Sequence, residues 1–207
     1  MRERTRSLWE QQNRHPGDRH RLFASLADTF PASRVLYPGS FVDIAPSFVF
    51  DWVTYVDTDR RAAAFFDDAD GVNEIIGRHR QGDTEWHFIR SDYTVDFGVR
   101  LADFDLLISL YAGFVSEHCG AYLRSGGFLV ANPSHGDVAM ASIDPHYRLA
   151  AVVNARSGRY SVRSDDLETY LIPRQPVEIN AEMLQRSGRG IAYTRSPYAY
   201  VFQRRDI

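Results

Sequence analysis

The sequence predicts an α/β fold, in which a mostly parallel seven-stranded sheet lies between two layers of helices. Three observations support this expectation. Short apolar runs alternate with stretches of helical spacing, which is typical of strand–helix–strand units. The run at 104–109 is almost continuously apolar, as in a strand covered on both faces. No repeat or flexible linker divides the chain, so we expect one domain over residues 1–207.

The elements follow in order along the chain. We expect one or two helices within 5–30, ending before Pro31, and further helices over about 60–76 and 112–123. Residues 1–30 form a helical extension in this interpretation, and the polar residues 157–190 form an insertion before the last strand. The predicted strands cover residues 35–37, 53–56, 86–89, 104–109, 128–131, 147–153 and 198–202.

Composition narrows the range of partners. Of the 207 residues 44% are apolar and 25% are charged, with a net charge of −3 and an isoelectric point of about 6.2. This balance favours neither a nucleic-acid nor a membrane partner. The N-terminus is charged and lacks the apolar stretch of a signal peptide, and no run approaches the roughly 18 apolar residues of a membrane helix. We therefore expect a cytoplasmic protein.

Two residue counts exclude whole classes of chemistry. All 24 basic residues are arginine, so a pyridoxal-phosphate Schiff base, a lysine aldolase and a phosphate-binding P-loop lysine are impossible. Cys119 is the only cysteine, which rules out an intrachain disulfide and disfavours a cysteine-based zinc site. No HExxH motif or histidine cluster is present, and we expect no metal.

Candidate site residues follow the predicted strands. Ligands of an open parallel sheet bind at the carboxyl ends of its strands, near the point where the strand order reverses. Polar or small residues follow the carboxyl end of each of the first five predicted strands. They lie in the segments 37–43, 57–59, 91–92, 109–113 and 132–137. We expect these five segments to meet at one edge of the sheet.

The order of these segments resembles the class I S-adenosylmethionine-dependent methyltransferases, over residues 34–203. That family has a glycine-bearing turn after the first strand, acidic residues after the second and third, a Phe-Asp-apolar fourth strand and a Leu-x-x-Gly-Gly turn before the fifth. The corresponding stretches here are Val35-Leu36-Tyr37-Pro38-Gly39, Val56-Asp57, Ser91-Asp92, Phe104-Asp105-Leu106-Leu107-Ile108 and Leu123-Arg124-Ser125-Gly126-Gly127.

The resemblance implies a Rossmann-like fold with an antiparallel last strand, and S-adenosylmethionine as cofactor. Gly39 would allow close approach of backbone and ligand. Asp57 would accept hydrogen bonds from the ribose, and Asp92 would meet the adenine amino group with Thr58 beside the ring. The cofactor-binding residues expected in this way are Tyr37, Gly39, Ser40, Asp43, Asp57, Thr58, Ser91, Asp92 and Ser109. As alternatives, Asp57 is a loop or helix-capping residue, and Asp43 and Asp92 are turn residues.

The chain departs from the family pattern in the turn after the first strand. Tyr37 stands where the family has an acidic residue for the cofactor's amino-acid moiety, and a phenol carries no charge at neutral pH. Only Gly39 of the family's three glycines is present, because Phe41 and Asp43 replace the others. The turn therefore differs in both charge and bulk.

For catalysis we single out His135 and Tyr111. His135 would act as general base, with Asp137 near enough in sequence to orient its ring, and Tyr111 would contact the methyl acceptor. A solvent-exposed or helix-starting histidine and a packing tyrosine are the alternatives.

The leading hypothesis is a methyltransferase that acts on a small molecule. The alternative is a non-catalytic methyltransferase-like protein that binds a nucleotide-like metabolite or a protein partner. A nicotinamide oxidoreductase is disfavoured because no Gly-x-Gly-x-x-Gly follows the first strand. The sequence leaves the oligomeric state open, and a homodimer is one option.

Overall fold

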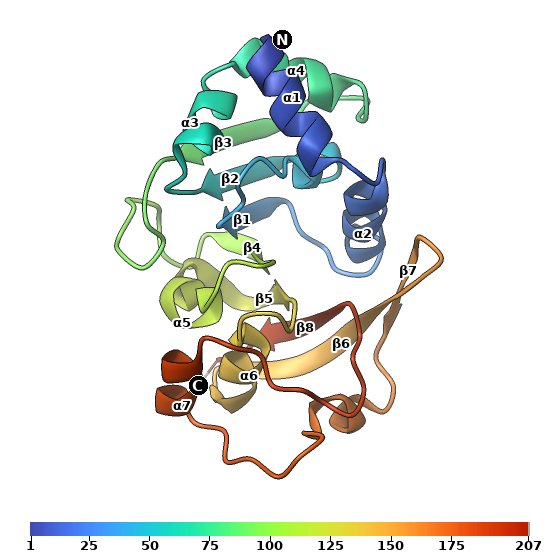
Figure 1. Ribbon diagram of the computed structural model, residues 1–207, viewed down its shortest axis with the longest axis vertical. Coiled ribbons are helices and arrows are strands. Elements are labelled where there is room, and N and C mark those ends of the chain that lie inside the picture. Colours follow the sequence, from blue (N-terminus) through green and yellow to red (C-terminus); the bar gives the residue numbers. More distant parts are fainter. Residues whose placement is uncertain (207) are drawn as a thin grey trace.

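A computed structural model describes residues 1–206, and its strands form a single eight-stranded sheet (Figure 1). The strand order is β3-β2-β1-β4-β5-β8-β6-β7. The bounds are β1 (Arg34–Pro38), β2 (Trp52–Val56), β3 (Glu85–Ile89), β4 (Phe104–Ser109), β5 (Leu123–Ala131), β6 (Tyr147–Arg156), β7 (Arg159–Arg163) and β8 (Ala199–Arg204).

The pairing confirms a mostly parallel sheet whose last strand is antiparallel. Strands β3, β2, β1, β4 and β5 pair in parallel, whereas β8 inserts antiparallel between β5 and β6. The chain moves outward from β1 to β3 and then crosses back to β4, on the other side of β1. The order therefore reverses between β1 and β4, where a ligand crevice is expected.

Helices cover both faces of the sheet. Neighbouring side chains of a strand point to opposite faces, so an apolar strand such as β1 presents side chains to both helical layers. Val35 and Tyr37 of β1 join one apolar cluster and Leu36 joins the other. The first cluster is covered by α1 (Glu3–Gln12), α2 (Asp18–Ala27), α3 (Arg60–Phe66) and α4 (Ala69–Gly77). The second is covered by α5 (Val115–Cys119) and α6 (Asp137–Ile143), and α7 (Ala181–Ser187) packs outside α6.

The structure corrects several predicted elements. The stretch 60–76 forms two helices, because the Asp68 carboxylate caps α4 and accepts hydrogen bonds from the Arg2 N–H at 2.6 Å and the Thr5 hydroxyl at 2.7 Å. The predicted helix at 112–123 shortens to α5 and a 3₁₀ turn, η2 (Gly120–Tyr122). The Gly-Gly stretch expected as a turn belongs to β5. Between β1 and β2 the chain forms only the 3₁₀ helix η1 (Ala45–Phe48), with a proline near its start.

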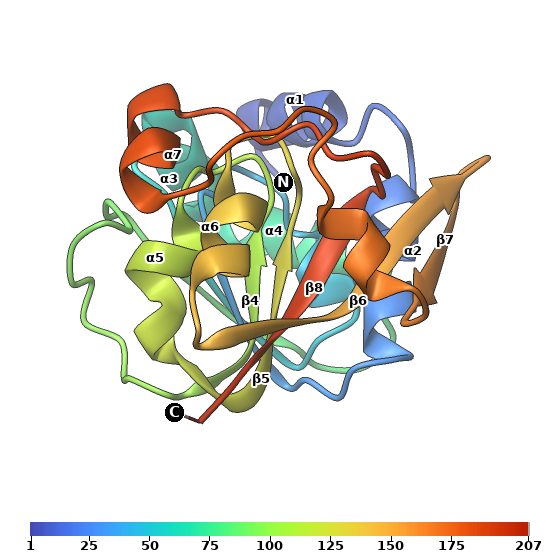
Figure 2. The same cartoon turned by 90° about the horizontal axis from the view of Figure 1, so that it is seen from below.

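The predicted insertion contains the eighth strand. Strand β7 pairs antiparallel with β6, and the segment continues through η3 (Leu167–Leu171) and α7. The hairpin of β6 and β7 projects beside α2 (Figure 2). Arg21 donates to the Gly158 carbonyl at 2.7 Å, and the Tyr160 hydroxyl donates to Asp18 at 2.8 Å. These bonds join α2 to the hairpin of β6 and β7. None of the helices within 1–206 has the length and apolar character to cross a membrane.

Candidate functional site

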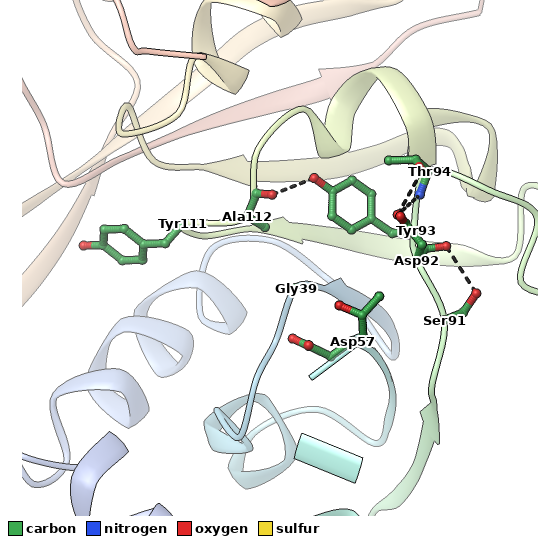
Figure 3. Close-up of a pocket in the computed structure, with 9 residues that line it drawn as sticks. Gly39, Asp57, Ser91, Asp92, Tyr93, Thr94, Tyr111 and Ala112 are labelled. Carbon is green, nitrogen blue, oxygen red and sulfur yellow. Dashed lines mark hydrogen bonds between the residues drawn. The ribbon is translucent and has the colours of Figure 1, made fainter. Parts of the chain in front are cut away.

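A cavity of about 460 Å³ opens at the carboxyl ends of β1 to β4, where the strand order reverses (Figure 3). It brings together six of the residues singled out from the sequence: Gly39, Asp57, Thr58, Ser91, Asp92 and Tyr111. Tyr93, Thr94 and Ala112 complete its lining. Its volume lies within the usual range for small-molecule sites, roughly 300–1,000 Å³.

Gly39 forms the turn that leaves β1. Its φ is +65°, in the left-handed region that glycine adopts without strain, and its N–H donates to the Val56 carbonyl at 2.8 Å. A Cβ built on Gly39 would lie 2.5 Å from the Ala112 Cβ. The glycine therefore permits contact with the loop after β4, a reason for it that the sequence did not reveal.

Asp57 follows β2 and is half-buried at the cavity wall. One carboxylate oxygen accepts from the Phe41 N–H at 2.7 Å, and the other accepts from the Asp59 N–H at 2.8 Å. A carboxylate oxygen accepts two hydrogen bonds, so each keeps capacity for a ligand hydroxyl. The capping role that was the alternative for Asp57 belongs to Asp59, which accepts from the Arg61 N–H at 2.7 Å.

Phe41 does not fill the gap between Gly39 and Asp57. Its backbone has a φ of +48°, which directs its N–H toward Asp57. Its ring packs under the Arg61 guanidinium at 4.9 Å and does not line the cavity. The bulky residue in the turn thus leaves the crevice open.

Asp92 and its neighbours form the wall beyond β3. The Asp92 Oδ1 accepts from the N–H and the hydroxyl of Thr94, at 2.9 and 2.8 Å, and these bonds lower the pKa of Asp92 below its ordinary value. The turn role is therefore real, but it uses only Oδ1. Oδ2 accepts no hydrogen bond from any residue in 1–206, so a ligand donor can reach an unused oxygen of this exposed side chain.

Tyr93 is a cavity residue that the sequence analysis missed. Its hydroxyl donates to the Ala112 carbonyl at 2.6 Å, which connects the loops after β3 and β4 (Figure 3). Burial raises the pKa of Tyr93 to about 12, so the phenol stays protonated. Its position directly after Ser91-Asp92 was the available signal.

Tyr111 lies at the edge of the cavity, with 58% of its surface exposed. Its φ of +63° is uncommon for a residue with a side chain. Its backbone N–H donates a hydrogen bond of 3.2 Å to the Asn132 Oδ1. In Figure 3 its ring extends away from Tyr93 and the acidic residues. A large aromatic surface is thus presented to solvent beside the crevice.

Tyr37 and Asp43 lie outside the cavity lining, in a buried cluster with Arg19 of α2. The Asp43 carboxylate accepts from the Arg19 Nε at 2.8 Å and from the Tyr37 hydroxyl at 3.1 Å. Arg19 also donates to the hydroxyls of Tyr37 at 3.2 Å and Tyr198 at 2.9 Å. Burial and the Asp43 charge raise the pKa of Tyr37 well above its ordinary value. Nothing in the local sequence around Arg19 identified it as the partner.

Ser109 and His135 also differ from expectation. The Ser109 hydroxyl is buried and donates to Asp137, which also accepts from the N–H and hydroxyl of Ser116. Asp137 therefore connects β4, α5 and α6 and does not orient His135. The exposed His135 ring has its Nδ1 2.7 Å from the Ser134 hydroxyl.

Ser40 is buried, and its hydroxyl has no partner among the described residues.

The charged side chains that line this cavity are all acidic. Its described lining contains two carboxylates, Asp57 and Asp92, and no basic side chain. Across residues 1–206 no group of three or more histidine, cysteine or acidic residues is arranged to hold a metal ion. The site therefore favours a ligand that donates hydrogen bonds and carries no phosphate.

The chain has the Rossmann-like fold of the class I methyltransferases. A protein from Klebsiella pneumoniae assigned as an O-methyltransferase is 10% identical, with a TM-score of 0.52 over 100% of this chain and 91% of that one. A Geobacter sulfurreducens methyltransferase is 18% identical, with a TM-score of 0.49 over 73% and 85% of the two chains. The N-methyltransferase NodS from Bradyrhizobium japonicum, in complex with S-adenosyl-L-homocysteine, is 16% identical, with a TM-score of 0.44 over 68% and 80%. No protein-family model and no curated protein matches the sequence.

Proposed function

We propose that the chain is an S-adenosylmethionine-dependent methyltransferase that acts on a small molecule. The observation that supports this most directly is the Asp57 carboxylate, which two backbone N–H groups hold at the cavity wall at the end of β2. A fixed acceptor at this point of a parallel sheet suits the two hydroxyls of a ribose. Asp92, one strand further along, suits the amino group of the adenine.

The charge of the cavity supports an adenosyl ligand over a phosphate-bearing nucleotide. S-adenosylmethionine carries a positive sulfonium, and the charged side chains of the described cavity lining are two carboxylates, so the cavity favours a cationic ligand. A pyrophosphate would meet the same carboxylates without a basic residue to neutralise it. This difference disfavours a nicotinamide dinucleotide, as does the absence of a Gly-x-Gly-x-x-Gly turn after β1.

Bound S-adenosylmethionine supplies an electrophilic methyl group. The residues of this chain would contribute orientation, since holding two reactants in line supplies about 7–11 kcal/mol of barrier reduction. Asp57, Thr58 and Asp92 would bind the adenosyl half, and Tyr111 would present its exposed ring to the acceptor. His135, exposed beyond β5, is the proposed general base for an acceptor that must lose a proton.

A specific observation favours the alternative, a methyltransferase-like protein that binds a nucleotide-like metabolite without transferring a methyl group. Tyr37 and Asp43, which replace family residues near the cofactor's amino-acid moiety, are buried against Arg19. They cannot reach a ligand in the cavity without breaking that cluster. The cavity therefore offers more hydrogen-bonding groups to the adenosyl half of the cofactor than Tyr37 and Asp43 can offer to its methionyl half.

Isothermal titration calorimetry with S-adenosylmethionine, S-adenosylhomocysteine, adenosine and NAD distinguishes these functions. The enzyme hypothesis predicts binding of both adenosyl amino acids at least about tenfold tighter than adenosine, and no binding of NAD. Equal affinity for adenosine and S-adenosylmethionine would support the non-catalytic alternative. Absence of binding by all three adenosine compounds would contradict both.

A further inference from the structure

A second cavity, of about 420 Å³, lies on the face of the sheet below the segment 90–103. This segment connects β3 to β4 through turns and bends and contains no helix. In Figure 1 it swings out as a long loop beside the sheet. The cavity walls are Arg34, Trp52, Thr54, His87, Phe88, Ile89, Val99, Arg100, Asp103 and Phe104.

Flat side chains line the sheet side of this cavity. Arg34 and Trp52 are partners in the register of β1 and β2, as are Thr54 and His87 in that of β2 and β3. The rings of Trp52 and His87 lie 4.7 Å apart, with 36° between their planes. The Arg34 guanidinium lies 4.6 Å from the Trp52 ring centre. Together they form a continuous surface on which a planar ring can stack.

The charge of this second cavity is opposite to that of the first. Arg34 and Arg100 stand against one carboxylate, that of Asp103, so these three side chains together carry one net positive charge. Arg34 already pairs with Asp103 at 2.6 Å. Arg100 is exposed and forms no ion pair or hydrogen bond with any residue in 1–206, so its charge remains available to an anion.

From this combination we propose that the second cavity binds a small planar aromatic carboxylate. Its ring would stack on Trp52 and His87, and its carboxylate would pair with Arg100. Guanidinium and carboxylate are matched in geometry, and such charge-assisted pairs are stronger than neutral hydrogen bonds. The proposal does not depend on the ligand of the first cavity.

Size favours a small molecule over a second copy of the chain as the occupant. Ten residues line the cavity, whereas a stable protein interface engages about 20–30 residues on each side. The cavity volume is that of a site for a compound of drug size or smaller.

The proposal can be tested by calorimetric titration of the full chain with indole-3-acetate, and with indole and acetate as separate probes of ring and charge. His87→Ala and Arg100→Gln change exposed residues at the cavity. Arg90→Gln is the matched control, because Arg90 is exposed on the same segment but does not line the cavity. Sedimentation of the same samples reports the oligomeric state.

We expect indole-3-acetate to bind at least about tenfold more tightly than either probe alone. His87→Ala and Arg100→Gln should each weaken it by about three- to tenfold, with Arg90→Gln unchanged. Binding of indole alone with equal affinity, or insensitivity to both cavity variants, would overturn the proposal. So would a dimer that His87→Ala dissociates, since a second copy would then occupy this face.

Discussion

The Phe41 N–H donates a hydrogen bond of 2.7 Å to the Asp57 carboxylate, and this contact joins the turn after β1 to the end of β2. It depends on the left-handed backbone of Phe41 and holds Asp57 at the edge of the cavity. The bulky residue in this turn thereby positions the carboxylate that we propose for the ribose.

Asp57→Ala is expected to weaken S-adenosylmethionine binding by roughly tenfold or more, since it removes hydrogen bonds to a charged acceptor, each worth about 1.5–3 kcal/mol. Calorimetry measures the change. Asp59→Asn is the control, because Asn also caps helices and Asp59 does not line the cavity. Equal affinity in Asp57→Ala and the native chain would contradict the ribose assignment.

Gly39→Ala should destabilise the fold by about 2–4 kcal/mol, because it combines an unfavourable positive φ with a Cβ 2.5 Å from Ala112. Urea unfolding measures the loss. The matched control is Gly126→Ala: Gly126 has a φ of +74°, but nothing lies within 4 Å of the position of its Cβ. It should lose only the cost of the backbone strain, about 1–2 kcal/mol. Equal losses in the two variants would show that the Ala112 contact relaxes freely.

The sequence was sufficient for seven of the eight strands and for much of the cavity wall. Apolar runs ending in Asp57 and in Ser91-Asp92 marked strand ends, and parallel strands bring such ends to one edge. The buried partners were not predictable in this way. Arg19 donates a hydrogen bond to Tyr198, which is 179 positions away in the sequence. Asp137 accepts hydrogen bonds from Ser109 and Ser116 and none from the nearby His135. Such pairs depend on the packing of helices onto the sheet, which local spacing does not encode.

Strand β7 was missed for a related reason. Its five residues alternate between half-buried and exposed, and Tyr160 and Val162 alone contact the core. A strand at the edge of a sheet needs little apolar surface, so its pattern resembles that of a polar loop.

Arg19→Gln is expected to cost about 3–5 kcal/mol, because it leaves the Asp43 carboxylate buried without its charged partner. Asp43→Asn in the same background should recover part of that loss, since it removes the unpaired charge. A double-mutant cycle measured by urea unfolding gives the coupling between the two side chains. Strictly additive losses would mean that the ion pair contributes nothing to the fold.

His135→Ala should lower the rate of methyl transfer by about 10²–10⁴-fold for an acceptor that must lose a proton, if the histidine is the base. His146→Ala is the control, because His146 is also exposed but lies after α6 and is bonded to Asp144, whereas His135 follows the carboxyl end of β5. The measurement is the turnover number with the acceptor once one is identified. A loss in affinity for S-adenosylmethionine without a loss in turnover would assign His135 to binding.

The buried Asp137 predicts how stability depends on pH. Burial raises its pKa to about 6, above the value of about 3.9 for an unfolded chain, although Ser109 and Ser116 partly oppose the rise. Between pH 4 and 6 the folded state therefore binds more protons than the unfolded state, so this contribution to stability is complete below pH 4 and is lost as the pH rises through 6. The loss is on the order of 3 kcal/mol for a shift of about two units.

Asp137→Asn does not titrate and should lack this decline, whereas Asp67→Asn, at an exposed position, should retain it. Urea unfolding at several pH values between 4 and 7 measures the slope, and parallel curves for Asp137→Asn and the native chain would show that Asp137 is ionised across the whole range.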